Sequence, residues 1–188
     1  MPLTGAAAAR LYDDHVDAVH AMIARRVGSL RSPAITGEAF EYALRTWDRF
    51  DTDRGTERLF LYGAASAALR RHPTAEAEHL RALPTDPNPT TTIADPLMSA
   101  PPDRPNTVGH VDDAPATVDD DHDSPARAML RAIADLAPDD RDVLLLALWE
   151  SLPQSAIAEA LDMSVGTVRS ALGRVRRDLK VAATEVAG

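Results

Sequence analysis

The residues with the clearest chemical pattern lie near the C-terminal end of the chain, in the stretch MSVGTVRSALGRVRRDLK from Met163 to Lys180. From Val165 to Lys180 the stretch holds five basic residues and one acidic residue, although the whole chain has a net charge of −9. Basic and hydroxyl side chains of this kind bind phosphates and base edges of DNA. The pattern therefore indicates nucleic-acid binding rather than covalent chemistry.

The elements that must position these residues form a predicted helix-turn-helix from Gln154 to about Leu172. Ala158 is small enough for two helices to cross closely, and Asp162 tolerates the left-handed conformation of a tight turn. Ser164 is placed to cap the second helix, which we expect to run from Val165 to about Val181.

Within this second helix, Val168 and Leu172 are four residues apart and are expected to face the core. The opposite face then holds the predicted DNA-contacting side chains, which are Thr167, Arg169, Ser170, Arg174, Arg176, Arg177 and Lys180. In a major groove, the first half of such a helix would read bases and the second half would bind phosphates. From the pattern alone, a two-helix packing with a solvated Arg face stays open.

The rest of the chain predicts an all-α protein with two small helical domains, at 1–83 and 125–188. The segment 84–124 between them is rich in Pro, Asp and Thr and carries nine Asp against one Arg. It has too few large apolar residues to offset its ordering entropy, so we predict a disordered acidic linker. The low aromatic content of 4% fits Ala- and Leu-rich helical cores better than a β-sandwich.

Helix starts and stops are visible in both predicted domains. We expect caps at Thr4, Thr36, Thr74, Ser124 and Ser164, a stop at Gly28, a break at Ala137–Pro138 and a short helix starting near Pro153. The expected N-terminal helices are 5–27, one opening after Thr36, 56–71 and 75–83. Trp47 and Trp149 are expected to anchor the two cores, and His15 and His20 to be partly buried rather than ligands.

Several function classes are disfavoured. The chain has no Cys, no apolar run long enough to span a membrane and no P-loop or Gly-flanked nucleophile, so we expect no enzyme, no cofactor, no metal and no membrane association. The absence of Cys and of a signal peptide fits a cytoplasmic protein. Two pairs of basic residues have two equally good interpretations, as contacts to a partner or as solvated helix ends: Arg25–Arg26 and Arg70–Arg71.

The acidic linker allows two further interpretations. Its His and Asp residues at 110–123 include metal-ligand types, but their spacing matches no motif, so a solvated acidic segment is favoured. We also hypothesise that the Asp run at 119–123 competes with DNA for the basic helix in the free protein.

The segments also carry a family resemblance. The tail LPQSAIAEALDMSVGTVRSALGRVRRDL closely resembles region 4 of bacterial sigma factors of the extracytoplasmic-function group. The stretches LYDDHVDAV, ARRVG, GEAFEYAL and TWDRFDTDRGTERLFLYGAASAALRRH resemble region 2 of the same family. The two matches occur in the family's order and cover about three quarters of the chain. They leave out the linker, which resembles the family's linker in type but not in its residues.

This resemblance implies an initiation factor whose partners are promoter DNA, the RNA polymerase core and an anti-sigma protein. By family position, Glu38 and Glu41 would contact the polymerase core. Arg58, Arg70 and Arg71 would contact the −10 element, and the helix 165–180 would read the −35 element.

The sequence departs from the family mainly in region 2. Ser66–Ala67 stands where an Arg–Asn pair is common, Phe60 replaces a usual Trp, and SPAITGEAF keeps few polar positions of the core-docking patch. The recognition helix lacks a cation at Ala171. Two alternatives therefore stay open: a sigma-like DNA-binding adaptor that does not initiate transcription alone, and a dimeric helix-turn-helix repressor.

Overall fold

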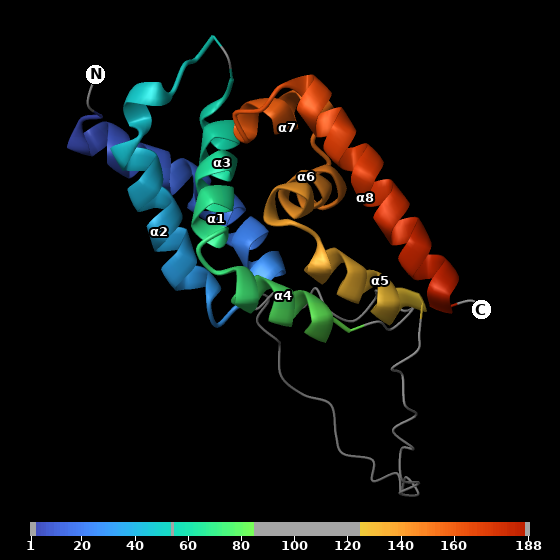
Figure 1. The fold of residues 1–188 in the computed structure, drawn as a ribbon. Helices are drawn as coiled ribbons and strands as arrows, with labels where there is room; N and C mark the ends of the chain where they lie inside the picture. The colour runs from blue at the N-terminus through green and yellow to red at the C-terminus, as the bar shows by residue number, and fades with distance from the viewer. Residues whose placement is uncertain (1–2, 54, 85–124, 187–188) are drawn as a thin grey trace, which may run out of the picture.

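Each α-helix of the described residues begins at a residue type that favours a helix start, either a capping hydroxyl or a nearby proline. The computed structural model describes residues 3–53, 55–84 and 125–186, and all regular secondary structure in these ranges is helical. The elements are α1 Gly5–Val27, α2 Ser32–Arg45, the 3₁₀ turn η1 Trp47–Arg49, α3 Glu57–Leu69, α4 Pro73–Ala82, α5 Pro125–Asp135, α6 Pro138–Leu148, α7 Gln154–Ala160 and α8 Val165–Val186 (Figure 1).

The predicted cap at Thr4 is confirmed, whereas Thr56, predicted as the first residue of a helix, is the N-cap of α3. The Thr4 hydroxyl accepts a hydrogen bond from the Ala7 amide at 3.4 Å, and the Thr56 hydroxyl accepts one from the Leu59 amide at 3.3 Å. Helix α1 ends at Gly28, whose φ of 80° lies in the region that favours glycine.

The predicted cap at Thr36 is wrong. Helix α2 begins at Ser32, because Pro33 in its first turn has a φ already set for a helix. Thr36 lies one turn inside the helix, is buried, and donates a hydrogen bond to the Ser32 carbonyl at 2.8 Å. The same effect of proline starts α4 at Pro73 rather than after Thr74.

Helices α1 to α4 form the N-terminal unit, in which α1, α2 and α3 pack side by side (Figure 1). Their core is made of small and aliphatic residues with Phe40 and Tyr62, and Phe40 is 5% exposed. Trp47 is half-buried and packs with Phe50 and Phe60 in an aromatic group at one end of the unit. The half-buried His15 and His20 lie near Glu57 and Ser32, respectively.

Helices α5 to α8 form the C-terminal unit, and this unit packs directly on the N-terminal one. Helix α4 lies against α5, and α3 lies against α7 (Figure 1). One hydrophobic cluster joins core residues of α1, α2 and α3 to Val143, Ile157 and Val168 of the other unit. A second cluster places Leu80 of α4 among side chains of α5, α6 and α8. The two units therefore share their cores.

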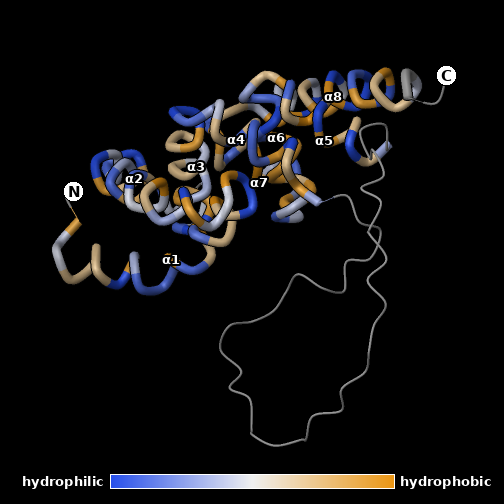
Figure 2. The backbone as a smooth tube through the Cα atoms, turned by 90° about the horizontal axis from the view of Figure 1, so that it is seen from below, coloured by the Kyte–Doolittle hydropathy of each residue, from blue (hydrophilic) through white to orange (hydrophobic). Residues whose placement is uncertain are grey.

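The hydropathy of the helices agrees with this packing. In Figure 2, blue and orange segments alternate along the helices, as expected when each has one buried and one exposed face. No helix in the described ranges combines the length and apolarity that crossing a bilayer would need. The predicted linker and its candidate ligands His110 to Asp123 lie outside the described residues, apart from Pro84.

Candidate nucleic-acid interface

The turn between α7 and α8 has the geometry that the sequence predicts. Asp162 adopts a φ of 51°, in the left-handed region that Asp tolerates better than most residues. The Met163 amide donates to the Ala158 carbonyl at 2.7 Å, which closes the end of α7. Because Ala158 is itself buried, the turn is tied to the core of the unit.

Ser164 fixes the start of α8. Its hydroxyl oxygen accepts a hydrogen bond from the Thr167 amide at 3.0 Å, so the predicted N-cap is confirmed. The two hydroxyl groups of Ser164 and Thr167 also lie 2.8 Å apart and share a hydrogen bond. Thr167 is thus held at the exposed first turn of the helix.

One face of α8 is buried against the unit. Val168, Ala171 and Val175 are at most 1% exposed, and Leu172 is half-buried beside them. Val168 therefore faces the core as predicted. Ala171 does so too, which explains why this position holds no cation: a charged side chain there would be buried against α6 and α7.

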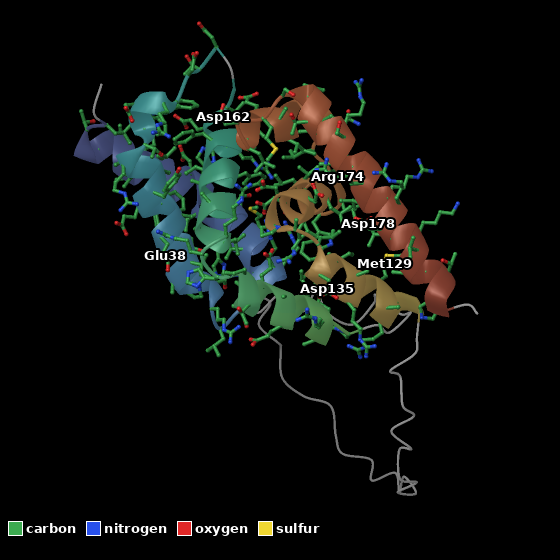
Figure 3. The ribbon with its side chains drawn as sticks, in the orientation of Figure 1. Glu38, Met129, Asp135, Asp162, Arg174 and Asp178 are labelled. Atoms are coloured by element: carbon green, nitrogen blue, oxygen red, sulfur yellow. The ribbon has the colours of Figure 1, made fainter. Side chains whose placement is uncertain are left out.

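The opposite face of α8 presents the predicted DNA-contacting residues to solvent. The exposed side chains are Thr167, Arg169, Ser170, Arg174, Arg176, Arg177 and Lys180. Figure 3 shows α8 with Arg174 and Asp178 labelled on it, and Asp162 at its turn. Among the described residues, no acidic side chain lies within ion-pair distance of Arg169, Arg176, Arg177 or Lys180.

Arg174 differs from the other cations because it is held by the first turn of α6. Its Nη2 lies 2.5 Å from Oδ1 of Asp140, and its Nε lies 3.1 Å from Oδ2. These hydrogen bonds, and the charge of Asp140, raise the pKa of the Arg174 guanidinium above its ordinary value. Arg174 lies on the predicted face, but it already has an anionic partner.

Comparison with known proteins identifies this unit. Residues 126–179 match the family described as Sigma-70, region 4. The C-terminal unit is therefore similar to a sigma-70 region 4 domain, and we call it the region 4 domain. Its predicted recognition helix α8 therefore lies within the matched residues up to Leu179.

A curated relative and a solved structure extend the comparison. The "RNA polymerase sigma-E factor" of Streptomyces avermitilis is 44% identical over 71 residues, which are 35% of this chain and 40% of the relative. The chain thus spans less than half the length of this relative. The sigma factor RpoE of Bartonella quintana, solved in complex with the anti-sigma factor NepR, has the same overall fold, with a TM-score of 0.50 at 12% identity over 94% of this chain and 96% of that one. The family model thus covers part of the C-terminal unit, and the solved structure adds a likeness of overall fold.

The two acids predicted to contact the polymerase core lie on α2. Glu41 is exposed and pairs with Arg45 one turn later at 2.9 Å. Glu38 accepts from Arg71 at 2.6 Å and lies 3.1 Å from His72. Partial burial acts to raise the pKa of Glu38, but the hydrogen bonds and charges of His72 and Arg71 outweigh it and lower the pKa below its ordinary value.

The three cations predicted to contact the −10 element lie on or just after α3, and each is engaged within the protein. Arg58 donates to the Tyr62 hydroxyl at 3.0 and 2.7 Å and lies over its ring. Arg71 is bound by Glu38. Arg70 binds two acids of the region 4 domain, Asp142 at 2.7 Å and Asp139 at 3.1 Å. The structure thus brings Arg70 to the other unit rather than leaving it free.

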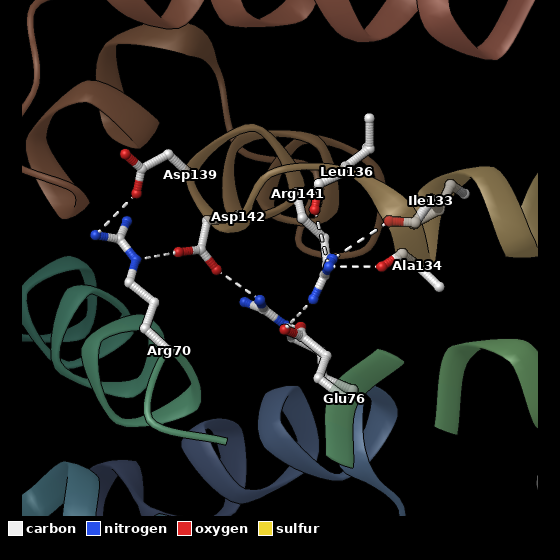
Figure 4. A network of polar contacts seen from close by, with 9 residues as sticks. Arg70, Glu76, Ile133, Ala134, Leu136, Asp139, Arg141 and Asp142 are labelled. Carbon is white, nitrogen blue, oxygen red and sulfur yellow. Dashed lines mark hydrogen bonds and ion pairs between the residues drawn. The ribbon is translucent and has the colours of Figure 1, made fainter. Parts of the chain in front are cut away.

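A buried ionic network between the units was missed by sequence reasoning (Figure 4). Arg26, which the sequence treats as a solvated or partner-binding helix end, is 2% exposed and donates to Glu76 and to Asp142, the latter at 2.5 Å. Arg141 donates to Glu76 at 2.9 Å and to three carbonyls at the end of α5. Desolvation acts to lower the pKa of Arg26, but the charges of Asp142 and Glu76 raise it overall.

The sequence holds little signal for this network. Glu76 and Asp142 lie near the starts of α4 and α6, where acids are expected simply because they suit a helix N-terminus. Among the described residues, no group of three or more His, Cys, Asp or Glu is arranged to hold a metal ion.

Proposed function

We propose that the chain is a sigma factor that binds the RNA polymerase core and directs promoter-specific transcription initiation, with α8 reading the −35 element. The observation that carries this proposal is the exposed basic face of α8 in a domain that matches sigma-70 region 4. The face is rigid, because Ser164 caps the helix and Val168, Ala171 and Val175 hold its other side to the core. A rigid helix with free cations suits a major groove.

The two halves of α8 support different roles in this reading. Arg169 and Ser170 lie in its first half, where a recognition helix approaches base edges. Arg176, Arg177 and Lys180 lie in its second half and would bind phosphates. Arg174, between them, would have to leave Asp140 to reach DNA.

We propose promoter DNA, the polymerase core and an anti-sigma protein as partners, and the cytoplasm as the location. The solved neighbour of this fold is described as a complex with an anti-sigma factor, which supports the third partner. For the core, Glu38 and Glu41 lie on one helix, α2, and both are accessible in part. The proposal includes no catalytic step and no cofactor.

The test is transcription in vitro from genomic DNA of the organism that encodes the chain, with core RNA polymerase of a Streptomyces species, the genus of the curated relative. We expect transcripts that start at defined sites and depend on the added chain. Loss of these transcripts with Arg169→Ala would tie them to α8. A complete lack of new transcripts, with the polymerase active on a control factor, would contradict the proposal.

A second candidate is a sigma-like DNA-binding adaptor that does not initiate transcription alone. It is favoured by the engagement of all three predicted −10 cations within the protein, and by the small residues Ser66–Ala67 on α3. This candidate predicts a DNA complex in a gel-shift assay without transcripts. A repressor would instead form a dimer on a palindromic site, which sedimentation of the DNA complex distinguishes.

A further inference from the structure

Gly173 lies in the middle of α8, on the side that the proposed function turns toward DNA. It stands three residues after Ser170 and four before Arg177, so the three positions share one face of the helix. Both of these neighbours are exposed, whereas Val168 and Val175 on the other side are at most 1% exposed. A side chain at position 173 would therefore point away from the protein.

Nothing in the part of the chain that the structure describes requires a glycine at this position. The backbone at Gly173 is helical, without the positive φ that Gly28 has. A Cβ atom built on Gly173 would meet no atom within 4 Å, whereas one built on Gly63 would lie 2.0 Å from the Ala160 carbonyl oxygen. Glycine is among the least favourable residues in the interior of a helix, so α8 loses stability here without gaining an internal contact.

The cations around Gly173 indicate what kind of surface would meet this gap. Arg169, Arg176 and Arg177 have no acidic side chain within ion-pair distance among the described residues. Their long side chains reach far from the helix axis, while the missing side chain lets the helix backbone itself approach a partner. A partner that meets both must be anionic and must fit closely against the helix. The major groove of duplex DNA has this form, with phosphates on both sides of the base edges.

Ser170 is the side chain that gains from a close approach. Its hydroxyl group is attached to a single carbon, so it reaches a base edge only when the helix backbone lies near the floor of the groove. There the hydroxyl can hydrogen-bond to either a donor or an acceptor of a base. A larger side chain one turn further, at position 173, would strike the groove first and hold Ser170 away. A long Arg side chain could still reach phosphates from such a raised position.

We propose that Gly173 is a positioning residue for sequence reading, which lets α8 lie deep enough in the major groove for Ser170 to contact a base. The inference rests on the proposed function for the assignment of α8 to DNA. It adds a division of roles within that helix. Gly173 and Ser170 set sequence preference through the depth of the helix, and the cations of its second half hold the phosphates at either depth. The glycine thus lowers the stability of α8 and raises its discrimination between DNA sequences.

The first experiment measures DNA binding by two variants of the full chain, Gly173→Ala and Gly173→Leu. The probe is a duplex selected from a random pool by the unmodified chain, and a duplex of scrambled sequence measures non-specific binding. We expect affinity for the selected duplex to fall by about threefold for Ala and by roughly tenfold or more for Leu, the discrimination that one base contact supplies. Affinity for the scrambled duplex should stay within about twofold, because the phosphate contacts persist.

The stability of the same variants should change in the opposite direction. Ala and Leu are both better helix formers than Gly, so both variants should unfold at a higher denaturant concentration than the unmodified chain. A glycine that merely supported the fold of α8 would give a loss of binding and a loss of stability together. The opposite signs therefore separate a positioning role from a structural one.

Gly37 provides the matched control. It lies in the middle of α2, is exposed, and an added Cβ there would also meet no atom within 4 Å. Figure 1 shows α2 and α8 on opposite sides of the molecule. Gly37→Ala and Gly37→Leu should therefore raise stability in the same way and leave the affinity for both duplexes unchanged.

The second experiment tests the link between Gly173 and Ser170. Ser170→Ala alone should weaken binding to the selected duplex, since it removes the hydroxyl group. In the Gly173→Leu chain the same substitution should have almost no effect, because the hydroxyl no longer reaches the base. A double-mutant cycle on the selected duplex measures this coupling.

Three results would overturn the inference. One is a Gly173→Leu chain that binds the selected duplex as tightly as the unmodified chain, or that loses affinity for both duplexes alike. Another is an equal effect of Ser170→Ala with and without Gly173→Leu. The third is a random pool from which the unmodified chain selects no sequence. Failure of the proposed function is a different result, the absence of transcripts with core polymerase, and it leaves the comparison of the two duplexes intact.

Discussion

The guanidinium of Arg174 donates to both carboxylate oxygens of Asp140, so the recognition helix α8 is tied to the first turn of α6 at the middle of its basic face. The contact has two consequences. It orients α8 on its own domain, and it neutralises one cation that would otherwise face DNA. DNA binding by variants of Asp140 measures which of these two effects is larger.

Asp140→Asn should free Arg174 and tighten binding of duplex DNA by the full chain. A released Arg gains about one phosphate contact, which steepens the dependence of binding on salt by about one unit. Gel shifts or anisotropy over a salt series measure this slope. Asp178→Asn, also on α8, removes the same charge without freeing a hydrogen-bonded cation. An equal change in both variants would indicate general repulsion instead of release of Arg174.

Arg169→Ala and Arg176→Ala should have different effects on DNA binding. Arg176→Ala should weaken binding to all sequences and flatten the salt dependence by about one contact. Arg169→Ala should relax sequence preference, at a cost of about 1–3 kcal/mol on the preferred site if this Arg reads a base. Selection from a random duplex pool, followed by salt titration on the selected site, measures both. Identical behaviour would contradict the division of α8 into reading and phosphate-binding halves.

Ser164→Ala should lower the free energy of unfolding by about 1 kcal/mol, because the Thr167 amide loses its capping acceptor. Chemical denaturation of the full chain gives this value. Ser164→Asn keeps a capping oxygen and should retain most of the stability. A stable Ser164→Ala protein would show that the cap is dispensable for α8.

Gly63→Ala and Gly173→Ala should change stability in opposite directions. At Gly63 the added methyl group meets the Ala160 carbonyl, so we expect a loss of about 1–3 kcal/mol. At Gly173 no atom lies within 4 Å of an added Cβ, so Ala should stabilise α8 by up to about 1 kcal/mol. Thermal denaturation of both variants tests the pair. A neutral Gly63→Ala would contradict the close approach of α3 and α7.

Glu38 should make stability depend on pH. Its pKa is lower in the folded chain than its ordinary value of 4.5, so its contribution is complete above that value and is lost as the pH falls through the lowered pKa. Glu38→Gln should therefore destabilise the protein near neutral pH, by no more than about 1 kcal/mol for so accessible a pair, and less in acid. Denaturation at several pH values measures the difference. Arg71→Gln should remove part of the same pH dependence.

Local features of the fold could be predicted from the sequence, because the residues that decide them are neighbours in the chain. The caps at Thr4 and Ser164, the left-handed Asp162 and the buried Val168 all belong to this class. The predicted cap at Thr36 was wrong because Pro33, three residues earlier in the chain, favours a helix start more strongly, so α2 begins at Ser32.

The contacts between the units could not be predicted, because their partners are far apart in the sequence. Arg26 and Asp142 are separated by 116 positions, and each has an ordinary reading as a residue at the end of a helix. The same holds for the candidate site. The basic face of α8 follows from helical spacing, whereas the engagement of Arg70 and Arg174 by acids of α6 follows from tertiary packing.

The hydrophobic cluster shared by the two units has a consequence for how the chain melts. Val143, Ile157 and Val168 pack with the core of α1, α2 and α3, so neither half has a complete interior of its own in this arrangement. We therefore expect heat to be absorbed in one cooperative transition, and damage to α3 to lower the melting temperature of α8 as well. A substitution far from the DNA-reading helix thereby acts on the fraction of molecules in which that helix is folded.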